Sequence, residues 1–196
     1  MRSAAERQFF DATAWQQINA LCDALIPADG DGPGALETRV PVFIDRQLAG
    51  DFGKAATWYM EGPFEPDADP NLGFQSPLSP AEIYREGLAW FDDWCNRTEG
   101  GSFTDLDNET RNRAVSALMD DEVDFPPELR DFPDFLLTQT KEGYLADPRH
   151  GGNAQMAAWS YIGFPGARAS FLPWTDPSRD GADYPLGPVS ISGERA

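Results

Sequence analysis

The segment from Ser79 to Cys95 constrains the fold most, because it combines the signals that start an α-helix with those that bury one. Ser79 can cap the helix, Pro80 suits its first position, and Glu82 can reach back to the cap. Apolar residues then follow at intervals of four, three and four, at Tyr84, Leu88, Phe91 and Cys95. This spacing puts them on one helical face, which must pack against other elements.

Helical spacing recurs along the chain. It runs from Trp15 to Ile26 until Pro27 ends it, and further helices are expected over 41–48, from Asp107 through Leu118, and over 133–145. Alternation with a period of two is almost absent. The 196 residues suit one domain. We therefore predict a mainly α protein, a single compact helical domain over residues 1–196 with about five to seven helices.

Long connections rich in Gly, Pro and aromatic residues complete the expected fold. The longest is an ordered loop from Phe52 to Pro80, and such loops usually carry function or cover something. Flexible ends are expected at about 1–9 and 190–196. Aromatic residues in or beside the loops, such as Trp58 and Phe74, either fold back over the core or form an interface.

Residues 143–167 read GYLADPRHGGNAQMAAWSYIGFPGA and contain the one histidine of the chain, His150. Asn153 is a good N-cap for a helix through Trp159 and Ile162. Gly163 fits the left-handed position after that helix, and Pro165 follows it. The segment is predicted to be a loop, a short helix and a loop, held at both ends.

The formal net charge is −18, which repels phosphate and anionic lipid. Nucleic acid and direct membrane insertion are therefore not expected, and no apolar run approaches the roughly 20 residues that span a bilayer. Motifs for dinucleotides, nucleotide phosphates, hydrolase nucleophiles, zinc proteases and haem are absent from the sequence.

Two sets of residues leave alternatives open. The acidic loops at Asp29 and Asp31, and at Asp67, Asp69 and Asn71, follow the first positions of a calcium loop but lack the closing glutamate. Cys22 and Cys95 lie outside any C-x-x-C motif. They could form one disulfide or remain two buried thiols.

The chain resembles the small subunit, subunit 3, of gluconate 2-dehydrogenase-type enzymes from about Phe10 to Ser192. The resemblance is carried by ALIPADGDGPGALETRVPVFIDRQLAG (24–50), WYMEGPF (58–64), GFQSPLSPAEIYREGL (73–88), TKEGYLADPRHGGN (140–153), IGFPGARA (162–169) and YPLGPVSISG (184–193). Each segment is weakly specific, but their order and spacing together make a good match.

The resemblance implies a non-catalytic partner of a large flavoprotein of the glucose-methanol-choline oxidoreductase class. Such complexes oxidise sugars, sugar acids or glycosides, often with transfer of electrons to a cytochrome c subunit. FAD belongs to the large subunit, so no cofactor is expected in this chain. The small subunit assists the export, maturation or stability of its partner.

Members of the family often begin with a twin-arginine export signal, whereas Arg2 stands alone here and no apolar region follows it. We expect a periplasmic complex with the leader absent from this chain; a cytoplasmic location is the alternative.

The segment around His150 is accordingly interpreted as a docking surface without catalytic residues. Its expected members are Tyr144, Asp147, His150, Asn153, Trp159, Tyr161, Phe164 and Pro165. The competing interpretations are an independent enzyme or small-molecule binder that uses His150, Asp147 and Asn153, and a calcium-stabilised structural module.

Overall fold

A capping box starts the longest helix, as the sequence predicts. In the computed structural model the hydroxyl of Ser79 accepts the amide of Glu82, and the Glu82 carboxylate accepts the amide of Ser79 at 2.8 Å. The structure describes residues 7–28, 30–65, 68–174, 176, 178 and 186–196. Its α-helices within these ranges are α1 (Ala12–Leu25), α2 (Val40–Ala49), α3 (Pro80–Thr98), α4 (Asn108–Met119), α5 (Phe132–Leu145) and α6 (Ala157–Tyr161). The mainly α prediction and the expected number of helices are confirmed.

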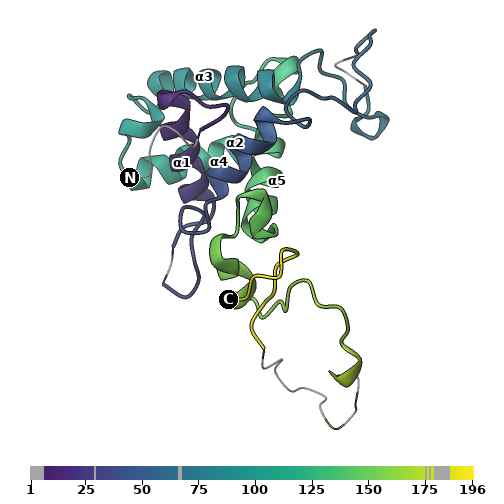
Figure 1. Cartoon of the computed structure of the whole chain (residues 1–196). Helices are drawn as coiled ribbons and strands as arrows, with labels where there is room; N and C mark the ends of the chain where they lie inside the picture. The colour runs from purple at the N-terminus through teal and green to yellow at the C-terminus, as the bar shows by residue number, and fades with distance from the viewer. Residues whose placement is uncertain (1–6, 29, 66–67, 175, 177, 179–185) are drawn as a thin grey trace.

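Short 3-10 turns shape the connections. They are η2 (Pro70–Leu72), η3 (Phe103–Asp105), η4 (Pro127–Leu129), η5 (Pro148–His150), η6 (Ala154–Met156) and η7 (Leu172–Trp174). In Figure 1, α3 runs across one end of the bundle, and the chain that follows α5 lies toward the opposite end. Within the described residues, none of the helices is both long and apolar enough to cross a bilayer.

The core lies where α1, α2, α3 and α5 meet. Its fully buried side chains include Ile18 of α1, Ile44 of α2, Tyr84 of α3 and Leu136 of α5. The helical spacing read from the sequence thus faces inward on each of these helices. Burial of such side chains contributes about 1.5 to 3 kcal/mol each to the free energy of unfolding.

The long loop before α3 is anchored by aromatic rings. Trp58 packs edge-to-face on Phe52 and Phe74, and Phe74 stacks on Phe135 of α5 with ring centroids 6.0 Å apart. Trp58 and Phe74 therefore fold back over the helices. Tyr59 of the same loop is 78% exposed.

The N-terminal segment is attached to α2 through one buried carboxylate. Asp45 is 1% exposed and accepts the backbone amides of Gln8, Phe9 and Phe10 at 2.6 to 3.0 Å. These bonds place the Phe10 ring 6.4 Å from that of Tyr84. They hold residues that the sequence assigns to the flexible N-terminal end, or directly after it.

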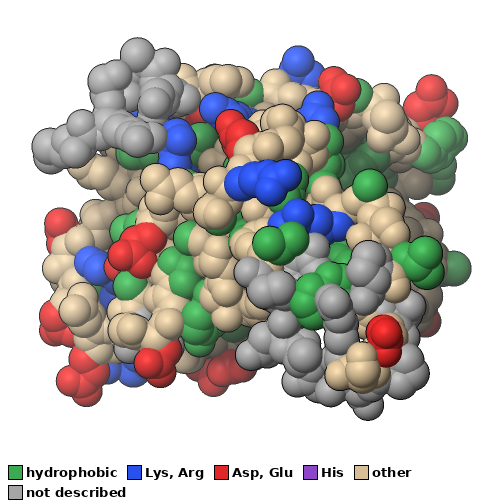
Figure 2. All heavy atoms as spheres, turned by 60° about the horizontal axis from the view of Figure 1, so that its bottom comes forward, with side chains coloured by type: hydrophobic (Ala, Val, Ile, Leu, Met, Phe, Trp, Pro, Cys, Tyr) green, Lys and Arg blue, Asp and Glu red, His purple; other side chains and the backbone are tan. Residues whose placement is uncertain are grey.

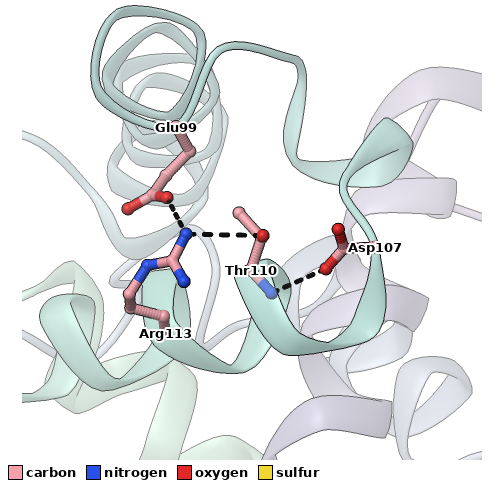
Figure 3. Close-up of polar contacts among 4 residues, drawn as sticks. All are labelled: Glu99, Asp107, Thr110 and Arg113. Atoms are coloured by element: carbon pink, nitrogen blue, oxygen red, sulfur yellow. Dashed lines mark hydrogen bonds and ion pairs between the residues drawn. The ribbon is translucent and has the colours of Figure 1, made fainter.

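The start of α4 is attached to the end of α3 (Figure 3). The carboxylate of Asp107 caps α4 by accepting the amide of Thr110 at 2.9 Å, and this hydrogen bond lowers the pKa of Asp107. One turn later Arg113 donates to Glu99, the residue after α3, at 2.6 Å. The pair closes the turn between the two helices.

Cys22 and Cys95 are free buried thiols in the structure. Of the two alternatives that the sequence left open, the structure therefore has the buried thiols and not the disulfide. The sulfur of Cys22 lies 3.8 Å from the hydroxyl of Thr140 on α5, whereas Cys95 lies near the end of α3. Burial is the main cause that raises the pKa of each thiol to about 12.

We expect Asp45→Ala to lower the free energy of unfolding by about 2 to 4 kcal/mol, because hydrogen bonds to a charged group contribute about 1.5 to 3 kcal/mol each. Urea denaturation measures the change. Asp11→Ala is the control, since Asp11 caps α1 through a single exposed hydrogen bond worth about 1 kcal/mol. Equal losses in the two variants would contradict a special role for Asp45.

Both thiols should remain unmodified by iodoacetamide in the folded protein and react fully after unfolding, because burial keeps them protonated. Intact mass spectrometry counts the added groups. If the unfolded protein gained mass from iodoacetamide only after treatment with a reductant, the two cysteines would instead form a disulfide.

Candidate partner interface

A rigid corner follows α5, and the buried carboxylate of Asp147 secures it. This carboxylate accepts the amide of Arg149 at 3.1 Å and the amide of Ile191, more than forty residues later, at 2.6 Å. Beside it, Val189 forms a backbone bridge with Gly166. The C-terminal segment, expected to be a flexible end, is thereby bonded to the corner.

Asn153 joins the two helices that flank the corner. It is fully buried, donates to the carbonyl of Ala146 at 3.0 Å, and accepts the amide of Ala158 at 3.0 Å. The close approach also requires Gly152, because a Cβ atom there would overlap the carbonyl oxygen of Gly143.

The helix predicted to begin after Asn153 is shorter than expected, which corrects the sequence interpretation. Asn153, Gln155 and Met156 all have positive φ, so η6 is separated from the five-residue helix α6 by a kink. Asn153 does cap α6, but from a distance, through its bond to Ala158 in the first turn.

The end of α6 agrees with the prediction. Gly163 has a φ of +71°, in the left-handed region that favours glycine. The amide of Gly163 donates to the backbone carbonyl of Ser160, and the amide of Phe164 donates to the carbonyl of Trp159 at 2.8 Å. This pair of bonds is a Schellman motif, which turns the chain sharply and fixes the direction of residues 161–165.

Three of the expected interface residues lie inside the fold. Trp159 is 7% exposed, and its indole N–H donates to the carbonyl of Leu145 at 2.8 Å. Asp147 and Asn153 are also buried. Tyr144 is half-buried and donates to the carbonyl of Pro33 at 2.8 Å. These residues support the corner from inside, and neighbouring residues form its exposed surface.

The exposed members form what we call the apolar ledge: Tyr161, Ile162 and Phe164, with exposed fractions of 53%, 54% and 45%. Phe164 packs edge-to-face on Trp159 at 5.1 Å. The ring of Tyr161 lies over Gly32, where a Cβ atom would be 2.8 Å away. Pro165 is half-buried beside the ledge. Ile162 is not among the interface residues expected from the sequence, which placed it only at the end of the short helix.

His150 is exposed, and its backbone amide donates to the carbonyl of Asp147 at 2.9 Å. The structure does not assemble His150, Asp147 and Asn153 into a reactive group, because the polar side-chain atoms of Asp147 and Asn153 bond to the backbone. His150 instead lines a groove with Phe43, Gln47, Lys141, Glu142, Leu145 and Ala146.

Of the residues proposed for calcium, Asp29 and Asp67 lie outside the described residues. The carboxylate of Asp69 accepts hydrogen bonds from the backbone amide and the side-chain N–H of Asn71, so Asp69 caps η2. In the part of the chain that is described, no group of three or more His, Cys, Asp or Glu side chains is arranged to hold a metal ion.

Comparison with known proteins gives one family. The family model described as gluconate 2-dehydrogenase subunit 3 matches residues 12–166. No curated protein and no solved structure matches significantly. The matched range includes α1 to α6 and the corner, and it ends at Gly166.

Trp159→Ala should lower the free energy of unfolding by about 3 to 5 kcal/mol, the usual cost of removing a buried aromatic side chain. Tyr161→Ala should cost about 1 kcal/mol or less, because much of its ring is already in water. Chemical denaturation of both variants checks the contrast. Similar losses would contradict the division into supporting and exposed residues.

Proposed function

The chain belongs to the gluconate 2-dehydrogenase subunit 3 family, and on this premise we propose that it is a non-catalytic subunit that binds and stabilises an FAD-containing dehydrogenase subunit. The observation that carries the proposal is the apolar ledge. Its three large apolar side chains are about half exposed to solvent, and a Schellman motif fixes the backbone that carries them. Aromatic anchors on a rigid backbone lose little entropy when they bind.

The rest of the proposal follows from the family. The partner is a flavoprotein of the glucose-methanol-choline class that oxidises a sugar, a sugar acid or a glycoside, and its electrons pass to a cytochrome c subunit. This chain contributes no cofactor of its own. Its role is in the maturation or export of the partner, and the complex works in the periplasm.

The alternative of an independent enzyme has less support. It requires His150 to act with Asp147 and Asn153, and the latter two side chains are buried and engaged with backbone groups. A general base must come within hydrogen-bond reach of its reacting group, together with a residue that orients it. The hydrogen bonds of Asp147 and Asn153 instead maintain the corner.

We expect Tyr161→Ala and Phe164→Ala to keep near-native melting temperatures and to weaken binding to the flavoprotein. Truncation of a central aromatic anchor costs about 2 to 4 kcal/mol, or roughly thirtyfold to almost a thousandfold in Kd. The measurement is a pull-down, followed by titration against the purified flavoprotein subunit.

Tyr59→Ala is the matched control, because Tyr59 is an exposed tyrosine in the loop before α3. If only that variant lost the partner, the interface would lie on the loop. The isolated wild-type subunit should be colourless and inactive with sugars. A yellow, FAD-loaded preparation of this chain alone, with dye-reducing activity, would refute the accessory role.

A further inference from the structure

We propose that the groove between α2 and α5 receives an acidic segment of the flavoprotein partner, with carboxylates at its rim and an apolar side chain on its floor. The inference rests on the proposed function and adds the chemistry of the partner at this surface. The groove, of about 530 Å³, is the one lined by Phe43, Gln47, Lys141, Glu142, Leu145, Ala146 and His150.

The floor of the groove is apolar and belongs to the corner. Phe43 is buried under it, and Leu145 at the end of α5 is 46% exposed. The carbonyl of Leu145 accepts the indole N–H of Trp159, which in turn supports Phe164 of the ledge. The groove and the ledge are therefore parts of one rigid unit, and one partner can contact both.

Three exposed cations from α5, η5 and α2 lie in or next to the lining of the groove, and we call them its rim. Lys141 of α5 is itself a lining residue, and Arg149 directly precedes the lining residue His150 in η5. Arg46, exposed in the last turn of α2, lies against the Gly151 turn, where a Cβ atom would be 2.9 Å from its Nη1. The lining carboxylate of Glu142 accepts a hydrogen bond from Gln139 at 2.7 Å.

This positive rim is exceptional in a chain of net charge −18. Residues 92–134 contain thirteen Asp and Glu against four Arg. Residues 140–174 contain two acidic residues, Glu142 and the buried Asp147, against Lys141, Arg149 and Arg168. Figure 2, which turns the lower end of Figure 1 forward, shows a few Lys and Arg side chains beside hydrophobic ones in the middle of that face, with no histidine in view.

The spread of the charges indicates a polypeptide rather than a small anion. The cations stand on α2, α5 and η5, all exposed, whereas a site for a small anion gathers buried donors around one point. Charges beyond roughly 8 Å are screened at physiological salt, so the local positive rim outweighs the distant acidic surface at short range. Nucleic acids and anionic lipid surfaces are disfavoured as partners, because they are extended and negatively charged and would be repelled by the acidic remainder of the surface.

The test compares two double variants that change the net charge equally. Arg46→Glu with Arg149→Glu reverses the rim, and Lys54→Glu with Arg97→Glu reverses two exposed charges elsewhere. Titration against the purified flavoprotein subunit should show the rim variant about tenfold to a hundredfold weaker than wild type, since lost charge-assisted contacts have effects of this size. The control should stay within about threefold.

Carbodiimide cross-linking of the wild-type complex identifies the occupant, because it joins an amine to a carboxylate in contact with it. We expect Lys141 to link to an Asp or Glu of the flavoprotein and Lys54 to remain unlinked. If the wild-type complex forms but the rim variant binds normally, or both variants weaken alike, the groove inference is overturned and the accessory role stands. If the wild-type chain does not bind, the proposed function itself fails.

A second copy of this chain is the competing occupant. Sedimentation of the isolated subunit separates the two cases: a wild-type dimer that the rim variant converts to monomer would overturn the proposal. A monomer in both supports it. Melting temperatures of both double variants should remain near that of wild type, since all four residues are exposed.

Discussion

The side-chain amide of Asn153 spans the corner between α5 and α6 with both of its ends, donating to Ala146 and accepting from Ala158. Without these two bonds the carbonyl of Ala146 and the amide of Ala158 would lose their partners, at a cost of about 1 to 3 kcal/mol for each buried group. Asp147 makes the same kind of connection to Ile191. The backbone that carries Tyr161, Ile162 and Phe164 follows directly from the corner that these buried polar groups hold.

Helices could be predicted from the sequence because their signals are local. Ser79 with Glu82, and Asp107 at the start of α4, lie within four residues of the amides they cap. The kink before α6 could not be predicted in this way. Asn153 is an ordinary N-cap residue by type, yet it lies at positive φ. Its side chain bonds to the carbonyl of Ala146, and the amide of the next residue, Ala154, bonds to the carbonyl of Thr38, which is distant in sequence. Tertiary packing there overrides the local preference.

The same distinction applies to the candidate interface. Sequence spacing identified the segment and the Gly163 turn, but it could not separate Trp159, which is buried, from Tyr161 and Phe164, which are exposed. That separation depends on the carbonyl of Leu145, which reaches Trp159 only after the chain has turned. Lys141 and His150 line a groove together with Phe43 and Gln47 of α2, and no local pattern in the sequence relates these residues to one another.

In the proposed complex, rigidity before binding would let a small exposed surface hold its partner stably. Burial of Tyr161, Ile162 and Phe164 by a partner would contribute roughly 25 cal/mol per Å² of apolar area removed from water. Ordering a mobile side chain at an interface would take away about 0.5 to 1.5 kcal/mol each. Here folding has already incurred much of that cost, because the Schellman motif fixes the backbone of the ledge and Trp159 supports the ring of Phe164. Most of the apolar contribution would therefore remain available for affinity in the proposed complex. The charged groove would then contribute specificity, because its cations favour a partner with matching carboxylates.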